Sequence, residues 1–376
     1  MMVDKRKFKD INVSLLGLGT MRLPCETEQK RESNPNIDYD KAQSLVDLAY
    51  KNGVNYFDTA YMYHCGKSEA FIGYALKKYP RDTYFIADKL PIWLCDTKED
   101  MKRVFDEQLE RTGMDYFDFY LLHSLDNENF EKCEKFDAYD FLKKMQKEGK
   151  IKYIGFSFHG TVDDLRNIVS AHKWDFAQIQ MNYLDWENQN AKMQYQILED
   201  AGIPTMEPVR GGKLALVNDE ISDMFKSLKP DNSPASWAMG FVASHKNIIT
   251  ILSGMNSAEQ MLDNLSTLTD FKPFTDIEYS LCEKAAAIIN KSEVISCTGC
   301  DYCQPCPKGI KISSFFSLYN SVVSGEIDIN LGRDKYNSYK VNPTACAWCN
   351  KCKNHCPQSI SVPDVLEGKV VKLFMQ

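Results

Sequence analysis

The sequence feature that most limits how this chain can fold is a regular alternation between apolar, strand-like segments and amphipathic, helix-like segments. The alternation runs from about residue 14 to about residue 268 and contains eight strand-like segments, each followed by a helix-like one. Alternating strands and helices predict a parallel sheet, and eight such units in ~250 residues are typical of a closed (β/α)8 barrel. We therefore expect an α/β protein built on a TIM barrel.

The expected strands are apolar and carry polar residues near their C-terminal ends. They fall within residues 14–24, 53–63, 84–91, 116–126, 151–160, 176–185, 204–214 and 248–257. Apolar spacing of three and four predicts the helices, which are expected from 38 to 53, around 98–112, 137–148, 161–172, 190–201 and 233–246, and from 258 onward. An open doubly wound sheet is the rival architecture, but no GxGxxG motif follows the first strand.

Composition argues against several classes of protein. No apolar run approaches the ~20 residues that a membrane span requires, so we expect no membrane insertion. A net charge of -7 with scattered basic residues argues against nucleic acid as a partner. The N-terminal sequence MMVDKRKFKD lacks the apolar stretch of a secretory signal, which predicts a cytoplasmic protein.

Eight of the thirteen cysteines lie between residues 297 and 356, in two runs of four. In a chain without a secretory signal, such a cluster favours metal binding over disulfides. The second run has spacings of two, two and three residues and precedes Pro357, as in bacterial ferredoxins; the first run is one residue shorter before its last cysteine. The runs are Cys297, Cys300, Cys303 and Cys306, and Cys346, Cys349, Cys352 and Cys356.

The two cysteine runs predict two 4Fe–4S clusters. Because the cysteine before proline commonly serves the other cluster, we expect the first three cysteines of each run to share a cluster with the last cysteine of the other run. Two alternatives stay open. One is a single cluster with a degenerate first site, and the other is a pair of structural zinc sites, although zinc ribbons normally use separated cysteine pairs.

The alternation of strands and helices stops near Phe271, and a helix expected around 275–290 leads into the cysteine-rich tail. We therefore expect a barrel domain at 1–290 and a ferredoxin-like 4Fe–4S domain at 291–376. Residues 311–332, between the cysteine runs, have helical rather than alternating apolar spacing. The second domain is thus expected to be smaller and mainly helical.

In the barrel, polar residues at the ends of successive expected strands form a candidate active site. An acid and a phenol lie in the sequence DTAYMY at 58–63, a lysine ends the next strand, and a histidine ends the strand after that. Barrels place their chemistry at these strand ends. The four residues are Asp58, Tyr63, Lys89 and His123.

Together with the sequence GFS at 155–157, these four residues resemble the aldo-keto reductases, and the resemblance covers roughly residues 11–268. It implies that Tyr63 is the acid, that Lys89 and Asp58 tune it, and that His123 orients the substrate. A free tyrosine has a pKa of about 10, and a nearby ammonium group lowers that value. We therefore expect Lys89 to make Tyr63 a better acid, and Asp58 to keep Lys89 protonated.

The resemblance also implies a nicotinamide cofactor, NADP or NAD. It places Ser157 and Gln178 at the carboxamide, Met206 where many members pack an aromatic ring against the nicotinamide, and Glu207 in a loop near the pyrophosphate. It places Ser253, Gly254, Met255, Asp263 and Asn264 in the last cofactor loop and helix. The chain departs from the family pattern at Phe158, where Asn is usual, and at Met206, where many members have an aromatic ring. No Arg or Lys lies between residues 253 and 265 to bind a 2′-phosphate, so the choice between NADP and NAD stays open.

The expected function is reduction of a small-molecule carbonyl compound, or oxidation of an alcohol, by nicotinamide hydride transfer in a protein that also carries 4Fe–4S clusters. Hydride moves two electrons, whereas each cluster accepts one, and no flavin site is recognisable to divide them. The clusters are therefore expected to be structural, or to serve a ferredoxin or another redox protein, unless a flavin replaces nicotinamide. The alternative is an electron-transfer protein whose barrel is a docking scaffold or a one-electron redox site.

Overall fold

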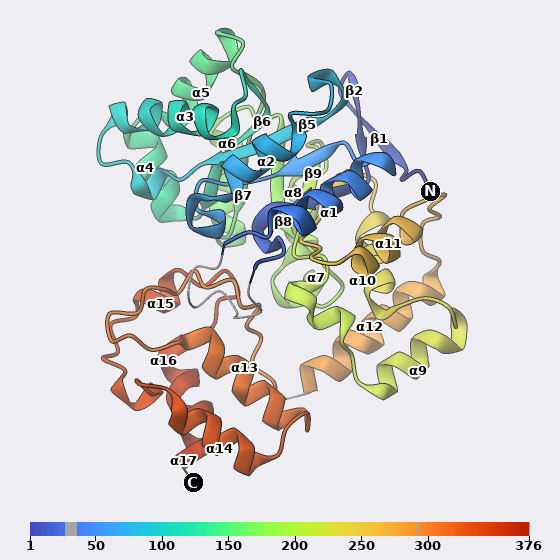
Figure 1. The fold of residues 1–376 in the computed structure, drawn as a ribbon, viewed down its shortest axis with the longest axis vertical. Coiled ribbons are helices and arrows are strands. Elements are labelled where there is room, and N and C mark those ends of the chain that lie inside the picture. The colour runs from blue at the N-terminus through green and yellow to red at the C-terminus, as the bar shows by residue number, and fades with distance from the viewer. Residues whose placement is uncertain (27–35, 292, 376) are drawn as a thin grey trace. The chain divides into compact units, whose positions relative to one another are not determined.

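A computed structural model describes residues 1–26, 36–291 and 293–375 of the chain (Figure 1). The chain divides into two compact units, which we call the barrel unit and the tail unit. The barrel unit is Met1–Val209 with Ala215–Glu283, and the tail unit is Arg210–Leu214 with Lys284–Gln376. The assignment of a reductase domain to 1–290 and a ferredoxin-like domain to 291–376 stays a prediction. None of the helices in the described part of the chain is long and apolar enough to cross a membrane.

The barrel unit contains a closed ring of eight parallel strands, in the order β10-β3-β4-β5-β6-β7-β8-β9. All neighbouring strands in the ring pair in parallel, which confirms the predicted (β/α)8 barrel. The strands are β3 (Leu16–Gly19), β4 (Tyr56–Asp58), β5 (Phe85–Leu90), β6 (Phe117–Leu125), β7 (Ile151–Phe158), β8 (Phe176–Gln180), β9 (Ile203–Met206) and β10 (Ile248–Ser253).

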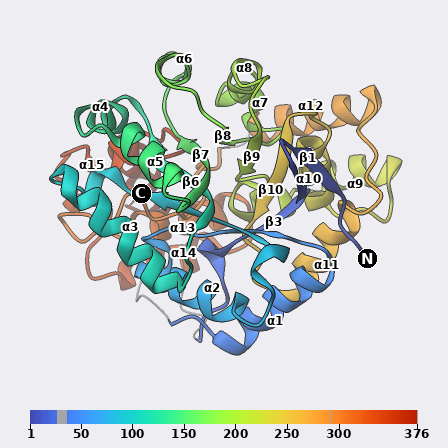
Figure 2. The ribbon, with the colours of Figure 1, turned by 90° about the horizontal axis from the view of Figure 1, so that it is seen from above.

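Helices follow the strands in sequence, and Figure 2 shows α1, α3 and α11 outside the ring of strands. They are α1 (Tyr39–Lys51), α2 (Ser68–Leu76), α3 (Lys98–Thr112), α4 (Asn127–Lys135), α5 (Ala138–Lys147), α6 (Val162–Ala171), α7 (Asp185–Asn188), α8 (Ala191–Ile197), α9 (Asp219–Leu228), α10 (Pro234–Ala243), α11 (Ala258–Thr267) and α12 (Asp276–Lys291). Helix α3 has the predicted bounds because Thr97 and Asp100 form a capping box at its start and Gly113 ends it in a left-handed conformation.

An antiparallel hairpin of β1 (Lys5–Phe8) and β2 (Ile11–Ser14) at the start of the chain was not predicted from the sequence. Phe8 of this hairpin is buried and packs against Phe119 and Tyr153, with ring centroids 5.7 Å and 5.2 Å away. The hairpin escapes sequence reasoning because its strands are only four residues long and its alternating lysines suggest a polar start rather than a packed element.

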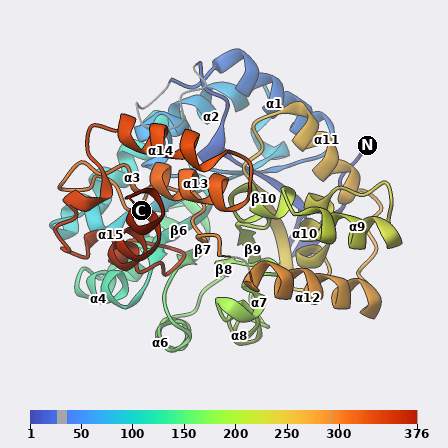
Figure 3. The same ribbon diagram turned by 90° about the horizontal axis from the view of Figure 1, so that it is seen from below.

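The tail unit is mainly helical, as predicted, and α13 lies beside α14 (Figure 3). Its helices are α13 (Ile312–Val323), α14 (Ile329–Ser338), α15 (Lys351–Asn354), α16 (Val362–Val365), the π-helical segment η7 (Leu366–Val371) and α17 (Lys372–Met375). The buried side chains of Phe315, Phe316 and Tyr336 belong to one apolar core, against which six of the eight clustered cysteines pack. Helical content alone does not establish a ferredoxin-like fold.

Residues Arg210–Leu214 belong to the tail unit although they lie between β9 and α9 in the sequence. The guanidinium group of Arg210 donates to Gln358 Oε1 through Nε and Nη2, at 3.2 Å and 3.0 Å. Lys213 donates to the carbonyl oxygen of Ile295. Gly211 has a φ of 66°, and a Cβ at this position would lie 2.7 Å from the carbonyl oxygen of Thr298, so the approach requires glycine.

The packing of α2 on α3 yields a test of the barrel unit. A Cβ added at Gly73 of α2 would lie 2.0 Å from the carbonyl oxygen of Thr112, a backbone atom that cannot move aside alone. We expect Gly73→Ala to lower the free energy of unfolding by about 3 kcal/mol in urea titrations followed by circular dichroism. Gly19→Ala is the control, because its Cβ would make an ordinary contact of 3.7 Å. Equal losses in the two variants would contradict the packing.

Candidate active site

The barrel brings the four predicted residues of the catalytic site together. Asp58 ends β4, Lys89 lies in the neighbouring β5, and His123 lies in β6, while Tyr63 begins the 3-10 turn Tyr63–Gly66 that follows β4. The Lys89 ammonium group donates to Asp58 Oδ1 at 2.7 Å and to the carbonyl oxygen of Thr59 at 2.7 Å. It also lies 3.4 Å from the hydroxyl oxygen of Tyr63. The lysine is thus the common contact of the acid and the phenol.

Lys89 is fully buried, and its charge therefore has to be compensated within the protein. An ammonium group has three N–H donors, and the Asp58 carboxylate, the Thr59 carbonyl and the Tyr63 hydroxyl oxygen accept one each. Because the Tyr63 oxygen accepts from Lys89, the phenolic hydrogen is free to point elsewhere. Among the described residues, Asp58 Oδ2 has no hydrogen-bond partner, so Asp58 is committed to Lys89 alone.

Burial of the phenol raises the pKa of Tyr63 well above the ordinary value, and the nearby Asp58 carboxylate acts in the same direction. Arg22 acts in the opposite direction but does not outweigh burial. The net effect is therefore opposite to the lowering that the sequence analysis expected from Lys89. Before any substrate binds, Tyr63 is a protonated phenol, which is the state in which a proton donor must begin.

His123 is a buried, neutral imidazole at the same site. Its ring centroid lies 6.3 Å from that of Tyr63 and 5.1 Å from that of Trp93, a residue that the sequence analysis did not single out. Burial lowers the pKa of His123 well below the ordinary value, and the charges of Lys89 and His159 add to this effect. Within the described part of the chain, His123 Nδ1 has no hydrogen-bond partner. A neutral imidazole can donate one hydrogen bond, but it brings no charge.

Three hydroxyl groups that the sequence analysis missed hold the end of β4. The Thr20 hydroxyl donates to the carbonyl oxygen of Asp58 at 2.9 Å, and the Ser68 hydroxyl donates to Thr20 Oγ1 at 2.6 Å. Thr59 Oγ1 lies 2.9 Å from Ser68 Oγ. These side chains tie β3, the end of β4 and the start of α2 together behind Asp58. Small hydroxyl residues next to glycine-rich strand ends are the only sequence sign of such a link.

Three of the predicted cofactor residues meet on neighbouring strands. Ser157 of β7 pairs in register with Gln178 of β8, and the Gln178 amide nitrogen lies 3.6 Å from Met206 Sδ of β9. The Ser157 hydroxyl oxygen accepts a hydrogen bond from the Ser124 backbone N–H at 2.7 Å. Gln178 Oε1 is buried and finds no partner among the residues that the structure describes. This oxygen could accept a hydrogen bond from the amide group of a bound nicotinamide.

Glu207 and Gly254 come together at Arg22, which the sequence analysis also missed. Arg22 Nη2 forms an ion pair with Glu207 Oε1 at 3.3 Å, and both side chains are partly buried. A Cβ at Gly254 would lie 3.3 Å from the Arg22 side chain, so glycine leaves room for this arginine. Arg22 therefore supplies a cation beside the acidic Glu207.

The predicted cofactor residues of the last loop and helix form hydrogen bonds with other residues of the barrel unit. The Asn264 amide donates to Ser253 Oγ at 3.1 Å, and Ser233, the N-cap of α10, donates to Asp263 Oδ2 at 2.7 Å. Met255 is buried. These contacts stabilise α11 and its preceding loop, and the roles of Ser253, Asp263 and Asn264 at a cofactor stay predictions.

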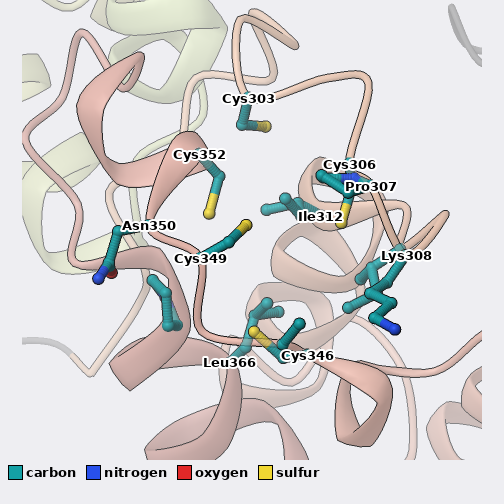
Figure 4. A pocket seen from close by; sticks show the side chains of 13 residues that line it. Cys303, Cys306, Pro307, Lys308, Ile312, Cys346, Cys349, Asn350, Cys352 and Leu366 are labelled. Carbon is teal, nitrogen blue, oxygen red and sulfur yellow. The ribbon is translucent and has the colours of Figure 1, made fainter.

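The clustered cysteines of the tail unit line two cavities. One cavity is bordered by Cys297, Cys300, Cys303 and Cys356, and the other by Cys303, Cys306, Cys346, Cys349 and Cys352 (Figure 4). None of the thirteen cysteines, all of which lie in the described ranges, forms a disulfide. In the ranges that the structure describes, no group of three or more His, Cys, Asp or Glu side chains is arranged to hold a metal ion.

The fold and the site define a (β/α)8-barrel protein whose strand ends carry a buried Lys–Asp pair beside a protonated phenol and a neutral imidazole. Residues 15–287 match the model of the aldo/keto reductase family. The chain therefore belongs to the aldo/keto reductase family, and it is an oxidoreductase of the type that reduces carbonyl groups with NAD(P)H. The family model ends before the first clustered cysteine.

The sequence identity to the two relatives described next is 25% and 22%. The chain is 25% identical over 307 residues to the NADH-specific methylglyoxal reductase of Escherichia coli, an alignment that covers 69% of this chain and 91% of that protein. It is 22% identical over 274 residues to L-galactose dehydrogenase of Arabidopsis thaliana, covering 66% and 84%.

Solved structures show the same fold. An aldo-keto reductase of Bacillus halodurans in its holo form superposes with a TM-score of 0.60 at 24% identity, covering 75% of this chain and 96% of that one. An aldo-keto reductase of Klebsiella pneumoniae in complex with NADPH superposes with a TM-score of 0.58 at 20% identity, covering 76% and 95%.

The neutral state of His123 predicts a pH profile. Burial and nearby charge lower the pKa of His123 well below that of an ordinary histidine, which is about 6.5, so His123 stays neutral where an ordinary histidine titrates. We expect kcat/KM for carbonyl reduction to show no inflection near pH 6.5, in the wild-type protein and in His123→Gln alike. An inflection that is present in the wild type and lost in His123→Gln would contradict a neutral imidazole.

Proposed function

We propose that the protein reduces a small-molecule carbonyl compound with NADH or NADPH, using Tyr63 as the proton donor. The observation that carries this proposal is the position of the buried Lys89 ammonium group, which contacts both the Asp58 carboxylate and the Tyr63 hydroxyl oxygen. A cation in this place stabilises a phenolate more than a phenol, and therefore acts most strongly when the proton leaves.

Each residue has a role in this reaction. The carbonyl oxygen of the substrate gains negative charge as hydride reaches its carbon, and Tyr63 supplies a proton to that oxygen. Lys89 stabilises the phenolate that forms, and Asp58 keeps Lys89 charged and oriented. His123, being neutral, donates a hydrogen bond to the same substrate oxygen. An acid positioned in this way typically contributes roughly 10²- to 10⁴-fold to the rate.

The site also suits a nicotinamide cofactor, which supplies the hydride when bound. The partnerless Gln178 Oε1 is a ready acceptor for the carboxamide N–H, and the Ser157 hydroxyl can donate to the carboxamide oxygen while it accepts from Ser124. The absence of Arg and Lys between residues 253 and 265 of the sequence, and the name of the Escherichia coli relative, both favour NADH. Fluorescence titrations with NADH and NADPH measure the preference directly.

Removal of the Tyr63 hydroxyl group tests its role as the proton donor. We expect Tyr63→Phe to lower kcat for carbonyl reduction by at least ~100-fold, because the phenyl ring has no proton to give, while the affinity for the nicotinamide cofactor changes little. Tyr74→Phe is the matched control, since Tyr74 is 60% exposed on α2. Turnover by Tyr63→Phe at the wild-type rate would refute the assignment.

We also propose that the tail unit holds two 4Fe–4S clusters in a ferredoxin-like arrangement. The lining of the two cavities supports this proposal. Cys356 lines one cavity together with Cys297, Cys300 and Cys303. Cys306 lines the other with Cys346, Cys349 and Cys352, and Cys303 borders both cavities. A cubane cluster binds each thiolate at a different iron, so its ligands surround a cavity rather than converge on one ion. Figure 4 shows Cys306, Cys349 and Cys352 around one such space.

Iron and sulfide analysis tests the clusters. Protein purified without oxygen should contain about eight irons and eight sulfides per chain, absorb near about 400 nm, and lose about half of its iron in Cys297→Ser and in Cys346→Ser. Cys65→Ser is the control, because Cys65 is an exposed thiol of the barrel unit. About four irons in the wild type would indicate a single cluster, and a colourless protein with bound zinc would refute the proposal.

The electron flow between the two sites is a separate question. Nicotinamide transfers two electrons as hydride, and a 4Fe–4S cluster accepts one, so the clusters are proposed to support folding or to exchange electrons with a ferredoxin or another redox protein. Adding NADH or NADPH without a carbonyl substrate should leave the cluster absorbance unchanged. Bleaching by the nicotinamide alone would overturn this separation.

A further inference from the structure

A group of buried polar side chains that the proposed reaction does not use lies behind Lys89. Successive side chains of a strand point to opposite faces, so Asp88 points away from the face that carries Lys89. Asp88, Glu69 of α2 and Gln108 of α3 are all fully buried. Two buried carboxyl groups side by side are costly unless protons or cations compensate their charge.

Gln108 joins the members of this group. Its amide nitrogen lies within hydrogen-bond distance of Glu69 Oε1 at 3.1 Å, Asp88 Oδ1 at 2.9 Å and the carbonyl oxygen of Lys89 at 3.0 Å. Its amide oxygen accepts a hydrogen bond from the Tyr120 hydroxyl. The two carboxyl groups thus meet at one amide, and the same amide holds the backbone of the lysine.

The charges around the two carboxyl groups do not balance if both are ionised. Arg111 forms an ion pair with Glu69 at 3.0 Å, and the Lys89 ammonium group is already paired with Asp58. Asp88 Oδ2 is buried and, among the described residues, has no hydrogen-bond partner. A proton on Asp88 would remove a buried carboxylate charge, because Arg111 is paired with Glu69 and Lys89 with Asp58.

Burial raises the pKa of Asp88 well above its ordinary value, and the negative charge of Glu69 and, less strongly, that of Asp58 add to the effect, while Lys89 opposes it. Burial also raises the pKa of Glu69, but Arg111 and Gln108 oppose that shift. The Tyr120 hydroxyl, which donates to Gln108, also lies near the pair, and burial raises the pKa of this phenol. Because Arg111 is paired with Glu69 and no cation is paired with Asp88 among the described residues, we expect the proton of the pair to lie mainly on Asp88.

We propose that Asp88 and Glu69 form a buried acid–carboxylate pair that shares one proton and positions both Lys89 and Tyr63 for the reaction. This inference rests on the proposed function of those two residues. Asp88 Oδ1 accepts a hydrogen bond from the Lys89 backbone N–H at 2.8 Å, and Gln108 holds the Lys89 carbonyl oxygen. The backbone N–H and carbonyl groups of Lys89 are thereby both hydrogen-bonded to side chains of this buried group.

The same network reaches the segment that carries Tyr63. Arg111, which is paired with Glu69, donates to the Tyr61 hydroxyl oxygen at 3.1 Å and stacks on the Tyr61 ring at 4.1 Å. The Tyr61 hydroxyl donates to Glu107 at 2.7 Å. Tyr61 lies two residues before Tyr63 in the chain. Asp88 and Glu69 are thus positioning residues, which act on the proton donor and on its lysine without touching the substrate.

Two replacements of Asp88 test whether its side chain is protonated or charged. In Asp88→Asn, the amide oxygen can still accept from Lys89 and Gln108, and the amide nitrogen can donate to Glu69 as the protonated acid would. We expect kcat of this variant to stay within about twofold of the wild type from pH 6 to 9. In Asp88→Ala, kcat should fall at least ~10-fold, because a displaced donor loses reactivity steeply, while the nicotinamide dissociation constant stays within about twofold.

A pH profile distinguishes positioning from a general loss of stability. If Lys89 is displaced from Tyr63, the alkaline limb of kcat in Asp88→Ala should move to higher pH, since less positive charge stabilises the phenolate. Tyr61→Phe, a change at a partly exposed ring that leaves the core intact, should move the limb in the same direction by a smaller amount. An unmoved limb in both variants would overturn the positioning role.

Infrared spectroscopy tests the shared proton even if Asp88→Ala does not fold. A protonated carboxyl group absorbs above the amide I band, and we expect such a band in the wild type at neutral pH and its loss in Asp88→Asn. Its absence from the wild type, or an Asp88→Asn variant that binds nicotinamide but is as inactive as Asp88→Ala, would refute the pair. The infrared band does not depend on the role of Tyr63. A failure of the proposed reaction would be detected separately, as turnover of Tyr63→Phe at the wild-type rate.

Discussion

The buried ion pair between Lys89 and Asp58 is the interaction on which the rest of the barrel site depends. A fully buried ammonium group is tolerated only where its three donors find acceptors, and this requires β4 and β5 to be neighbours in a fixed register, with Asp58 opposite Ala87. The hydroxyl groups of Thr20 and Ser68 hold the end of β4. Asp88 and Gln108 hold β5 from its other face. Hydrogen bonds at both strands thus hold the Lys89 ammonium group in place.

The tail unit presents a different chemical problem, because its cysteines line cavities within a small apolar core. That core is not built from the C-terminal residues alone. Arg210 is bonded to Gln358, two residues beyond Cys356, and Gly211 lies against Thr298, next to Cys297. The loop after β9 therefore contributes to the packing around the first cysteine cavity. A fragment that begins at Lys284 would lack this contribution, and for this reason the full chain is the appropriate material for studying the cysteines.

Much of this architecture could be predicted, and the failures have identifiable causes. The eight strands were predictable because each is a short, largely apolar run, and most of these runs carry a polar residue at or near the C-terminal end. Helix α3 was predictable because its capping residues are adjacent in the sequence. The N-terminal hairpin was missed because its strands are short and half exposed. Asp88 was missed because one acid in an apolar strand suggests nothing until Glu69 and Gln108 are seen beside it. The pKa of Tyr63 was misjudged because burial cannot be read from residue type.

The sequence by itself determined the class of the fold and the identity of the four candidate catalytic residues. Those properties depend on periodicity and spacing along the chain, which are local. The tertiary structure alone decided which buried acids lie together, which charges are compensated and which polar atoms of the described residues have no partner. These properties depend on distances between residues that are far apart in the chain, such as Glu69 and Arg111, and on the exclusion of water from the space between them.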